Sequence, residues 1–231
     1  MPSFTSLPYV AGDVVTRIGA HCSASVIHRL EKQINYLETG HWLQKNGFVA
    51  SHRTRTRDEV FAAAARKVKD QQVLYLEFGV YEGDTMRYWS RELTHPRSCL
   101  HGFDSFEGLP ETWHLRRPKG YFSTGGHIPQ IDDPRVKFFK GWFDETLPKY
   151  SLPRHEQLII NIDSDLYSSA KVVLDTLKPH ITPGTYLYFD ELCDPHHELK
   201  AFDEFLTDTG ARFELVAAFR DLSGVMFRRT G

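Results

Sequence analysis

The sequence predicts an α/β fold built around a doubly wound, mostly parallel sheet. Short apolar, β-prone runs alternate with segments of helical periodicity, which is the pattern of βαβ units. Two of these runs, Ile159–Asp163 and Tyr186–Asp190, end abruptly in carboxylates, and ligands of open α/β sheets bind beyond such strand ends. The chain closes with two runs joined by the tight stretch Asp221–Gly224, which predicts a hairpin and hence an antiparallel C-terminal strand.

The N-terminal part of the chain is predicted to lie outside the sheet. Residues 1–22 show no clear periodicity and are predicted to be irregular. Apolar residues then recur at helical spacing from Val26 onward, which predicts an amphipathic helix over about 23–45. The organisation we expect is an irregular segment and helical cap over 1–55, followed by one domain over 56–231.

Each later element follows from a local pattern. Acidic residues in the first turn favour a helix start at about residue 56, and Pro183-Gly184 marks the turn into a strand. Residues 105–135 are rich in Gly, Pro and aromatics and are predicted to be a long loop, a feature typical of lids and binding loops. We expect helices over 56–68, 85–93, 143–150, 168–180 and 199–206, and strands over 73–79, 99–104, 136–140, 159–163, 186–190, 213–219 and 225–228.

Composition narrows the classes of function. The 28 basic and 30 acidic side chains give a formal net charge of −2 without a long block of one sign, so no nucleic-acid partner is predicted. Three scattered cysteines without CxxC spacing argue against a disulfide framework and a structural zinc site. No apolar run approaches the ~20 residues of a membrane span, and the N-terminus lacks the pattern of a secretory signal. The predicted location is the cytoplasm, without a membrane partner.

The first predicted strand leads into a glycine-containing turn that suits a ligand. Gly79 and Gly83 allow a tight turn and close approach of the backbone, and the next helix presents free N–H groups to an anion. Asp104 ends the second strand, where an acid commonly holds ribose hydroxyls. Together they favour a nucleoside-containing cofactor, although an ordinary strand-to-helix turn remains the alternative. The dinucleotide fingerprint GxGxxG is absent, which disfavours a nicotinamide oxidoreductase.

Four carboxylates follow the two acidic strand ends: Asp163, Asp165, Asp190 and Glu191. Carboxylates at neighbouring strand ends repel one another unless a cation or a shared proton intervenes. Oxygen-only ligands favour Mg²⁺, Ca²⁺ or Mn²⁺ over zinc, and a nearby carboxylate can act as a general base. The alternative is structural, with Asp165 or a neighbouring serine capping the next helix.

Four segments of the chain form a recognisable set: Gly102–Trp113, Gly141–Pro148, Asp163–Ser169, and Pro183-Gly184 followed by Phe189–Glu191. Together they resemble the motifs of one enzyme family, the macrocin/mycinamicin (TylF-type) sugar O-methyltransferases. The resemblance covers roughly residues 72–205, with the segments in the family's order and at plausible spacing.

The resemblance implies a Rossmann-like class I methyltransferase that transfers a methyl group from S-adenosylmethionine to a hydroxyl of a sugar or other natural product. Gly79 and Gly83 would face the methionine part of the cofactor, and Asp104 would hold the ribose. The segment Gly141-Trp142 and Ser105 would lie near the adenine. The full set expected to bind the cofactor is Glu77, Gly79, Gly83, Asp104, Ser105, Gly141, Trp142 and Asp163.

The family is usually magnesium-dependent, so the resemblance also implies Mg²⁺ held by Asp163, Asp190 and Glu191, with Asp165 as the catalytic general base. The chain departs from the family at Glu191, where a second Asp is usual, and at Thr185, which replaces a Gly. Because Glu is one methylene longer, its oxygen can overshoot the ligand position. These departures bear on the metal site and not on methyl transfer.

Two alternatives to a metal-assisted enzyme stay open. One is a metal-independent methyltransferase of the same fold, in which Glu191 contacts the substrate. The other is a non-catalytic S-adenosylmethionine-binding scaffold, although the survival of Asp163, Asp165 and Asp190 together speaks against it. The partners expected are a small-molecule acceptor, which the sequence does not name, and a second copy of the chain in a homo-oligomer.

Overall fold

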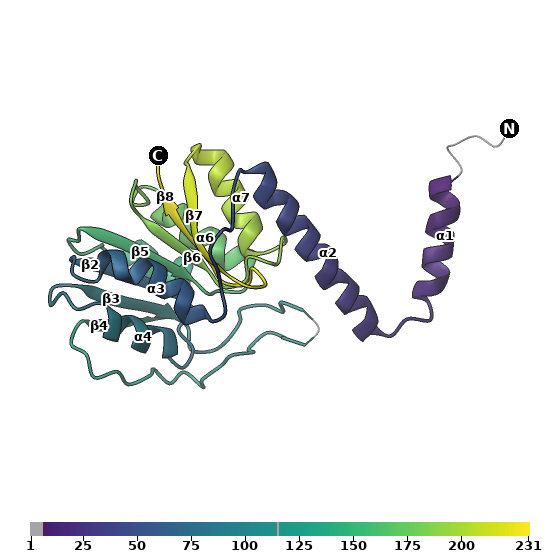
Figure 1. Ribbon diagram of the computed structural model, residues 1–231. Helices are drawn as coiled ribbons and strands as arrows, with labels where there is room; N and C mark the ends of the chain where they lie inside the picture. The colour runs from purple at the N-terminus through teal and green to yellow at the C-terminus, as the bar shows by residue number, and fades with distance from the viewer. Residues whose placement is uncertain (1–6, 115) are drawn as a thin grey trace.

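The computed structural model describes residues 7–114 and 116–231, and it contains one eight-stranded sheet (Figure 1). The strand order is β1-β7-β8-β6-β5-β2-β3-β4, and all neighbours are parallel except the pairs that β8 makes with β6 and β7. This confirms the doubly wound, mostly parallel sheet and its C-terminal hairpin. The strands are β1 Arg53–Thr54, β2 Val73–Phe78, β3 Cys99–Asp104, β4 Val136–Lys140, β5 Gln157–Ile162, β6 Tyr186–Phe189, β7 Phe213–Phe219 and β8 Val225–Arg229.

Helices cover both faces of the sheet and form two apolar layers. Side chains of α3 and α4 pack on one face, around Phe61 and Trp89, and those of α6 and α7 pack on the other, around Val173 and Phe202. The predicted bounds of these elements hold to within a few residues. The helices are α1 Leu7–Gly19, α2 Ala24–Lys45, α3 Arg57–Val68, α4 Asp84–Glu92, α5 Phe143–Thr146 with a 3-10 turn at Leu147–Lys149, α6 Tyr167–Leu177 and α7 Glu198–Thr209.

The strand order reverses between β2 and β5, and ligands of doubly wound sheets bind at this switch point. Gly79 follows β2 with a φ of +95°, and Asp163 follows β5. A Cβ atom on Gly79 would lie 1.8 Å from the backbone oxygen of Asp163, so only glycine fits there. The glycine therefore lets the two strand ends approach each other closely at the switch point.

The prediction that residues 1–22 are irregular is wrong for 7–19, which form α1. Gly12 and the β-branched run Val14-Val15-Thr16 lower the helix propensity of this segment, so propensity alone does not predict the helix. Short strand β1 lies before the predicted domain boundary at residue 55, yet it pairs with β7 and so extends the sheet. No helix of the described residues is long and apolar enough to cross a membrane.

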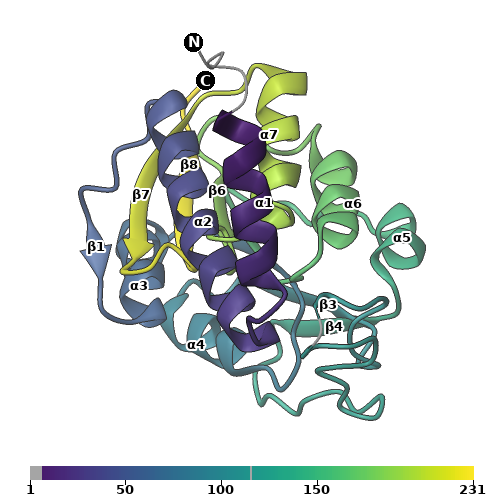
Figure 2. The ribbon, with the colours of Figure 1, turned by 90° about the vertical axis from the view of Figure 1, so that its right-hand side faces the viewer.

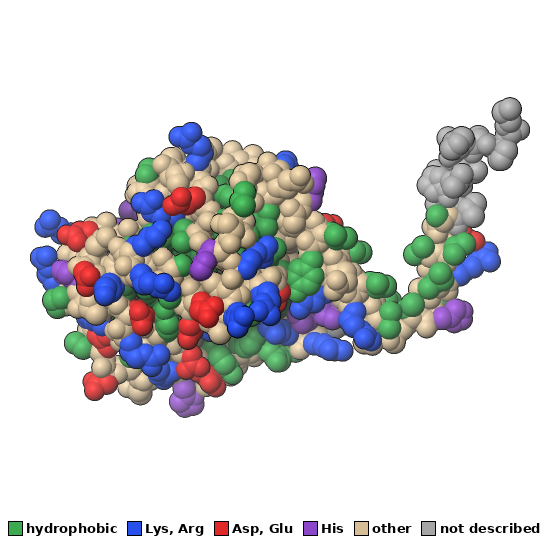
Figure 3. Space-filling view, viewed as in Figure 1, with side chains coloured by type: hydrophobic (Ala, Val, Ile, Leu, Met, Phe, Trp, Pro, Cys, Tyr) green, Lys and Arg blue, Asp and Glu red, His purple; other side chains and the backbone are tan. Residues whose placement is uncertain are grey.

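Helices α1 and α2 form an N-terminal arm that leads away from the sheet (Figures 1 and 2). The C-terminal end of α2 is anchored, because Trp42 is buried and its Nε1 donates to Asp203 Oδ1 of α7 at 2.6 Å. The rest of the arm carries apolar side chains that face solvent (Figure 3). The exposed set is Val14, Val15, Ile18, Val26, Ile27, Leu30, Ile34 and Leu37.

Candidate functional site

A cavity of about 750 Å³ opens at the carboxyl ends of the parallel strands. It gathers nearly every residue that the sequence singled out, whether for cofactor, metal or catalysis. Its lining includes Glu77, Gly79, Gly83, Asp104, Ser105, Trp142, Asp163, Asp165, Asp190 and Glu191. Gly141 is absent from the lining; its backbone, at φ +143°, leads from β4 into Trp142, the N-cap of α5.

Asp104 ties together the loops that follow β2 and β3. Its Oδ2 accepts from the backbone N–H groups of Val80 at 2.8 Å and Tyr81 at 2.9 Å, and its Oδ1 accepts from Phe106 N–H at 2.7 Å. A carboxylate offers about four acceptor sites, so these three bonds leave capacity for one more donor. Asp104 can therefore support the glycine turn and still accept a hydroxyl from a ligand in the cavity.

Glu77 is a buried carboxyl at the inner end of the cavity. Only 1% of it is exposed, and its Oε2 accepts from the hydroxyl of Tyr75 at 2.8 Å, which in turn accepts from Asn161 Nδ2 at 3.0 Å. Burial raises the pKa of Glu77 to about 8, against the hydrogen bond from Tyr75 and the positive charge of Arg57. A cationic ligand in the cavity would stabilise the ionised form of this carboxyl.

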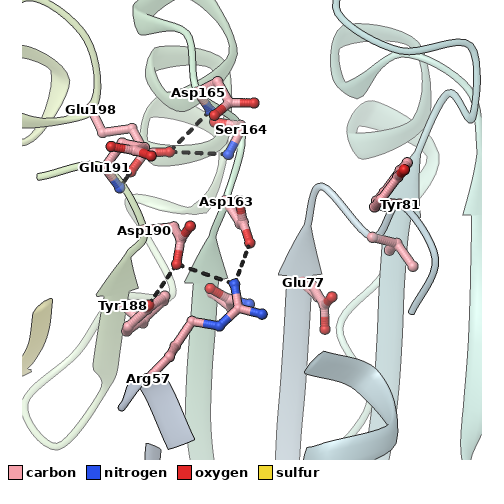
Figure 4. Close-up of polar contacts among 12 residues, drawn as sticks. Arg57, Glu77, Tyr81, Asp163, Ser164, Asp165, Tyr188, Asp190, Glu191 and Glu198 are labelled. Carbon is pink, nitrogen blue, oxygen red and sulfur yellow. Dashed lines mark hydrogen bonds and ion pairs between the residues drawn. The ribbon is translucent and has the colours of Figure 1, made fainter. Parts of the chain in front are cut away.

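Asp163 and Asp190 face each other across the ends of β5 and β6, and a guanidinium joins them (Figure 4). Nη1 of Arg57 lies 3.3 Å from Asp163 Oδ2 and 3.3 Å from Asp190 Oδ1. Asp190 Oδ1 also accepts from the hydroxyl of Tyr188 at 2.6 Å. Burial alone lowers the pKa of Arg57, but the two carboxylates outweigh burial and raise it.

This arrangement does not fit the predicted magnesium site. Among residues 7–114 and 116–231, no group of three or more His, Cys, Asp and Glu side chains is placed to hold a metal ion. Glu191 Oε2 instead lies 3.7 Å from Sγ of Cys193, which donates to it. Burial, with the neighbouring Asp190 and Asp165, raises the pKa of Glu191 to about 7. Asp163 and Asp190 do come together, but around Arg57.

Asp165 lines the cavity and does not cap helix α6. Its φ is +63°, a left-handed conformation that turns the chain out of β5, and α6 takes Leu166 as its N-cap. The residue is 8% exposed, and its carboxylate accepts no hydrogen bond within the described part of the chain. Burial raises the pKa of Asp165 to about 7, only partly opposed by Arg117. A general base is most effective with a pKa near the working pH.

Glu198, at the start of α7, holds both acidic loops in place, and no local sequence pattern indicates this role. It is fully buried, and its Oε1 accepts from the backbone N–H groups of Ser164 at 3.0 Å and Asp165 at 3.2 Å. Its Oε2 accepts from Glu191 N–H at 3.1 Å. One carboxylate therefore fixes the loop after β5 and the loop after β6.

Arg57 is the second functional residue that sequence reasoning missed. The cluster Arg53, Arg55, Arg57 before Asp58 and Glu59 predicts a solvated helix start. Helix α3 does begin at Arg57, and its side chain is 40% exposed, but its guanidinium also contacts Asp163 and Asp190, which was not predicted. Arg57 is the first residue of α3, and the packing of that helix on the sheet brings it to the carboxyl ends of β5 and β6. That long-range packing leaves no local signal in the sequence.

The loop over 105–135 contributes one wall of the cavity. Arg117 lies over the rings of Trp113 and Phe122, with its guanidinium carbon 4.8 Å and 5.0 Å from the ring centroids. Both Arg117 and Phe122 line the cavity, as do Leu109 and Lys119. The prediction that this long loop belongs to a binding site is supported by its place in the lining.

Comparisons with known proteins point to the same family as the motifs. The sequence profile of the family described as macrocin-O-methyltransferase (TylF) matches residues 127–229, which confirms the resemblance over that stretch. The mycinamicin III 3''-O-methyltransferase of Micromonospora griseorubida is 31% identical over 139 residues, which are 59% of this chain and 50% of that protein. A tetracenomycin-type enzyme of Streptomyces olivaceus, named 8-demethyl-8-(2,3-dimethoxy-alpha-L-rhamnosyl)-tetracenomycin-C 4'-O-methyltransferase, is 29% identical over 150 residues, 55% of this chain and 53% of that protein. The matched stretch thus spans about half the length of these relatives.

Solved structures confirm the fold class. The calicheamicin methyltransferase CalS11 superposes with a TM-score of 0.57 at 22% identity, covering 74% of this chain and 76% of that chain. The O-methyltransferase NovP superposes with a TM-score of 0.53 at 21% identity, covering 76% and 78%. At these identities the likeness shows the fold alone, which this chain shares with both methyltransferases.

Proposed function

From the resemblance to the TylF family and the cavity at the switch point, we propose that this chain is an S-adenosylmethionine-dependent O-methyltransferase of natural-product biosynthesis. The acceptor is a small molecule with a sugar or related hydroxyl. The observation that carries the proposal is the convergence of Asp104, Asp163, Asp165 and Asp190 on one cavity of about 750 Å³. The names of the relatives, which specify hydroxyls of glycosylated compounds, support the acceptor class.

The described residues fit the cofactor. Ser164 lines the cavity, and its buried Oγ lacks a hydrogen-bond partner in the described chain, so it awaits a ligand or water. Asp104 would hold the ribose, Glu77 would face the positive end of the methionine part, and Trp142 would border the adenine. Bound S-adenosylmethionine would supply a methyl group already activated on a positively charged sulfur.

The protein's own part in the reaction is to hold the acceptor and take its proton. An alcohol is a weak nucleophile because its pKa lies far above 7. The Asp165 carboxylate accepts the hydroxyl proton while the oxygen forms its bond to the methyl carbon. The cofactor would release this methyl group with its carbon–sulfur electron pair retained on sulfur. Water is kept from the reacting oxygen by the acceptor itself and by the 105–135 loop, which lines the cavity.

The metal-independent alternative is favoured over magnesium assistance, and no step is assigned to a metal. The supporting observation is that Arg57 already bridges Asp163 and Asp190, while Glu191 lies beside Cys193. A divalent ion in the same place would have to displace the guanidinium.

One assay tests the proposed function. The protein is incubated with isotopically labelled S-adenosylmethionine and a panel of glycosylated polyketides and nucleotide sugars, with EDTA or with Mg²⁺, and products are detected by mass spectrometry. We expect an O-methylated product in EDTA at a rate close to that with Mg²⁺. Turnover only with Mg²⁺ would restore the metal-assisted mechanism. Binding of S-adenosylhomocysteine without turnover on any acceptor would favour the scaffold, and a thermal shift with NAD alone would favour an oxidoreductase.

Replacing Asp104 tests the cofactor site. Asp104→Ala is expected to weaken S-adenosylhomocysteine binding by ~1–3 kcal/mol, because a charged acceptor and the support of the glycine turn are both lost. The matched control is Asp84→Asn, which also lines the cavity but has a side chain 83% exposed. Isothermal calorimetry measures both, and equal affinities for the two variants would remove Asp104 from the ribose site.

Self-association is a further part of the proposal, with the N-terminal arm as the contact between copies. Among the side chains that the structure describes, its two helices expose eight large apolar ones, and identical arms can bury such faces against each other. We expect sedimentation velocity to give a species larger than the 26.7 kDa chain, and the double variant Leu30→Glu/Ile34→Glu to give the monomer. A monomeric wild-type protein at high concentration would contradict this.

A further inference from the structure

The contact between Arg57 and the two strand-end aspartates is built by the fold. Arg57 is the first residue of α3, and the N-cap Thr56 fixes that helix start by accepting from Glu59 N–H at 3.2 Å. The guanidinium also lies 5.8 Å from the ring centroid of Phe61, one helical turn later. Helix α3 packs on the sheet through fully buried residues such as Val60 and Ala64. The guanidinium is thus delivered by a rigid element and not by a loop.

The contacts with Asp163 and Asp190 use only one of the three guanidinium nitrogens of Arg57. A single nitrogen, Nη1, makes both contacts, at 3.3 Å to Asp163 and 3.3 Å to Asp190. A guanidinium has five N–H donors, and Nε and Nη2 donate to no residue of the described chain. Arg57 lines the cavity, and its side chain is 40% exposed. The remaining donors are therefore free to meet a ligand from the cavity side.

Charge explains why a cation belongs between these carboxylates. Asp163 and Asp190 lie at the ends of adjacent strands, and Asp190 is further held by the Tyr188 hydroxyl. Two ionised carboxylates this close repel each other, and one positive charge between them relieves the repulsion. Mg²⁺ would serve the same purpose but needs oxygen ligands at roughly 2.0–2.1 Å in octahedral geometry. A guanidinium and such an ion compete for the same pair of oxygens.

We propose that Arg57 is the resident cation of this site, standing where related chemistry uses a divalent metal ion, and that its free N–H groups bind the acceptor oxygens. The fork of a guanidinium matches two neighbouring oxygens, so the acceptor class it favours is a vicinal diol or an alcohol beside a second oxygen. The first half of this inference is that Arg57 is the cation of the site, and it does not depend on the proposed methyl transfer. The second half, that its free N–H groups bind the acceptor, rests on that proposed function.

Metal binding tests the first half without any turnover. The wild-type protein, Arg57→Ala, Arg57→Lys and the double variant Arg57→Ala/Asp163→Asn are titrated with Mn²⁺, and bound ion is read by electron paramagnetic resonance. We expect Arg57→Ala to bind Mn²⁺ at least about tenfold more tightly than the wild type, because the carboxylate pair is vacated. Arg57→Lys keeps a positive charge and should resemble the wild type. The double variant should lose the gained site.

Two results would overturn the inference. One is Mn²⁺ binding by the wild type that Asp163→Asn abolishes, which would make the aspartates a metal site in the presence of Arg57. The other is an Arg57→Ala variant that folds, as judged by its melting temperature and S-adenosylhomocysteine affinity, yet gains no Mn²⁺ site. If Arg57→Ala does not fold, Arg57→Met preserves the stem that packs near Phe61 and replaces it in every comparison.

Kinetics test the second half once an acceptor is known. Arg57→Lys should raise KM for a diol acceptor more than for its mono-deoxy analogue, because a point charge replaces a two-pronged donor. Equal changes for both acceptors would contradict the diol contact. Absence of methyl transfer to every acceptor tested would contradict the proposed function. The Mn²⁺ titrations would still decide whether Arg57 is the cation of the site.

Discussion

Replacing Asp165 with asparagine is expected to lower kcat by ~10²–10⁴-fold, the usual contribution of a general base. Asparagine keeps the size of the side chain and tolerates the left-handed backbone at φ +63°, so the loop should keep its shape. Only the capacity to take a proton is lost. S-adenosylhomocysteine affinity, measured by calorimetry, should stay close to that of the wild type.

The pH dependence of kcat is a second test of Asp165 as the general base. Burial raises the pKa of Asp165 to about 7, and the base must be ionised to act, so kcat should fall as pH drops below about 7. Asp165→Asn should lose that limb. The control is Asp175→Asn on the outer side of α6, where the side chain is 52% exposed and pairs with Lys171. A variant at Asp165 with full rate and a lower melting temperature would leave it only a structural role.

Glu198→Ala is expected to destabilise the protein by about 3–5 kcal/mol, because it leaves two buried backbone N–H groups and a third, partly buried one without their acceptor. Urea unfolding with an unchanged m-value would report the loss as a lower midpoint. The same change should also reduce turnover, since Glu198 positions the loops that carry Asp165 and Glu191.

Glu198→Gln keeps the size of the side chain but replaces one of its two acceptor oxygens with an NH₂ group. Its amide oxygen can still accept from Ser164 and Asp165, but its NH₂ group meets Glu191 N–H, so a smaller loss of roughly 1–3 kcal/mol is expected. Asp208→Asn, on the same helix and 55% exposed, should stay within about 0.5 kcal/mol of the wild type. Unfolding of Glu198→Ala at the wild-type midpoint would mean that the three N–H groups find other partners.

Features that depend on local pattern could be predicted from the sequence. The strands that end at Phe78, Ile162 and Phe189 are mostly apolar, β-prone runs, and such runs identify buried parallel strands directly. The acidic residues at their ends then fall at one edge of the sheet by geometry alone. This is why nearly all the predicted site residues line one cavity.

Features that depend on tertiary contacts could not be predicted. Arg57 reaches Asp163 and Asp190 across separations of 106 and 133 residues, and nothing around it in the sequence distinguishes it from Arg53 or Arg55. Glu198 looks like an ordinary acidic first residue of a helix, whose usual partner is solvent. Its burial follows from the packing of α7 against the ends of two strands, which no spacing rule encodes.

Left-handed backbone conformations around the cavity lower the stability of the folded protein, which matters for any attempt to raise its melting temperature. Tyr81, Phe122 and Asp165 all line the cavity and all have left-handed φ values, of 52°, 65° and 63°. Each such residue gives up roughly 1–2 kcal/mol relative to an unstrained backbone, and glycine would remove that cost. Selection for heat resistance alone would therefore favour glycine at these positions and erase the side chains that shape the site. Stabilising substitutions are better sought in the parts of α3 and α4 beyond their first turns, because Arg57, Asp84 and Thr85 in those first turns line the cavity.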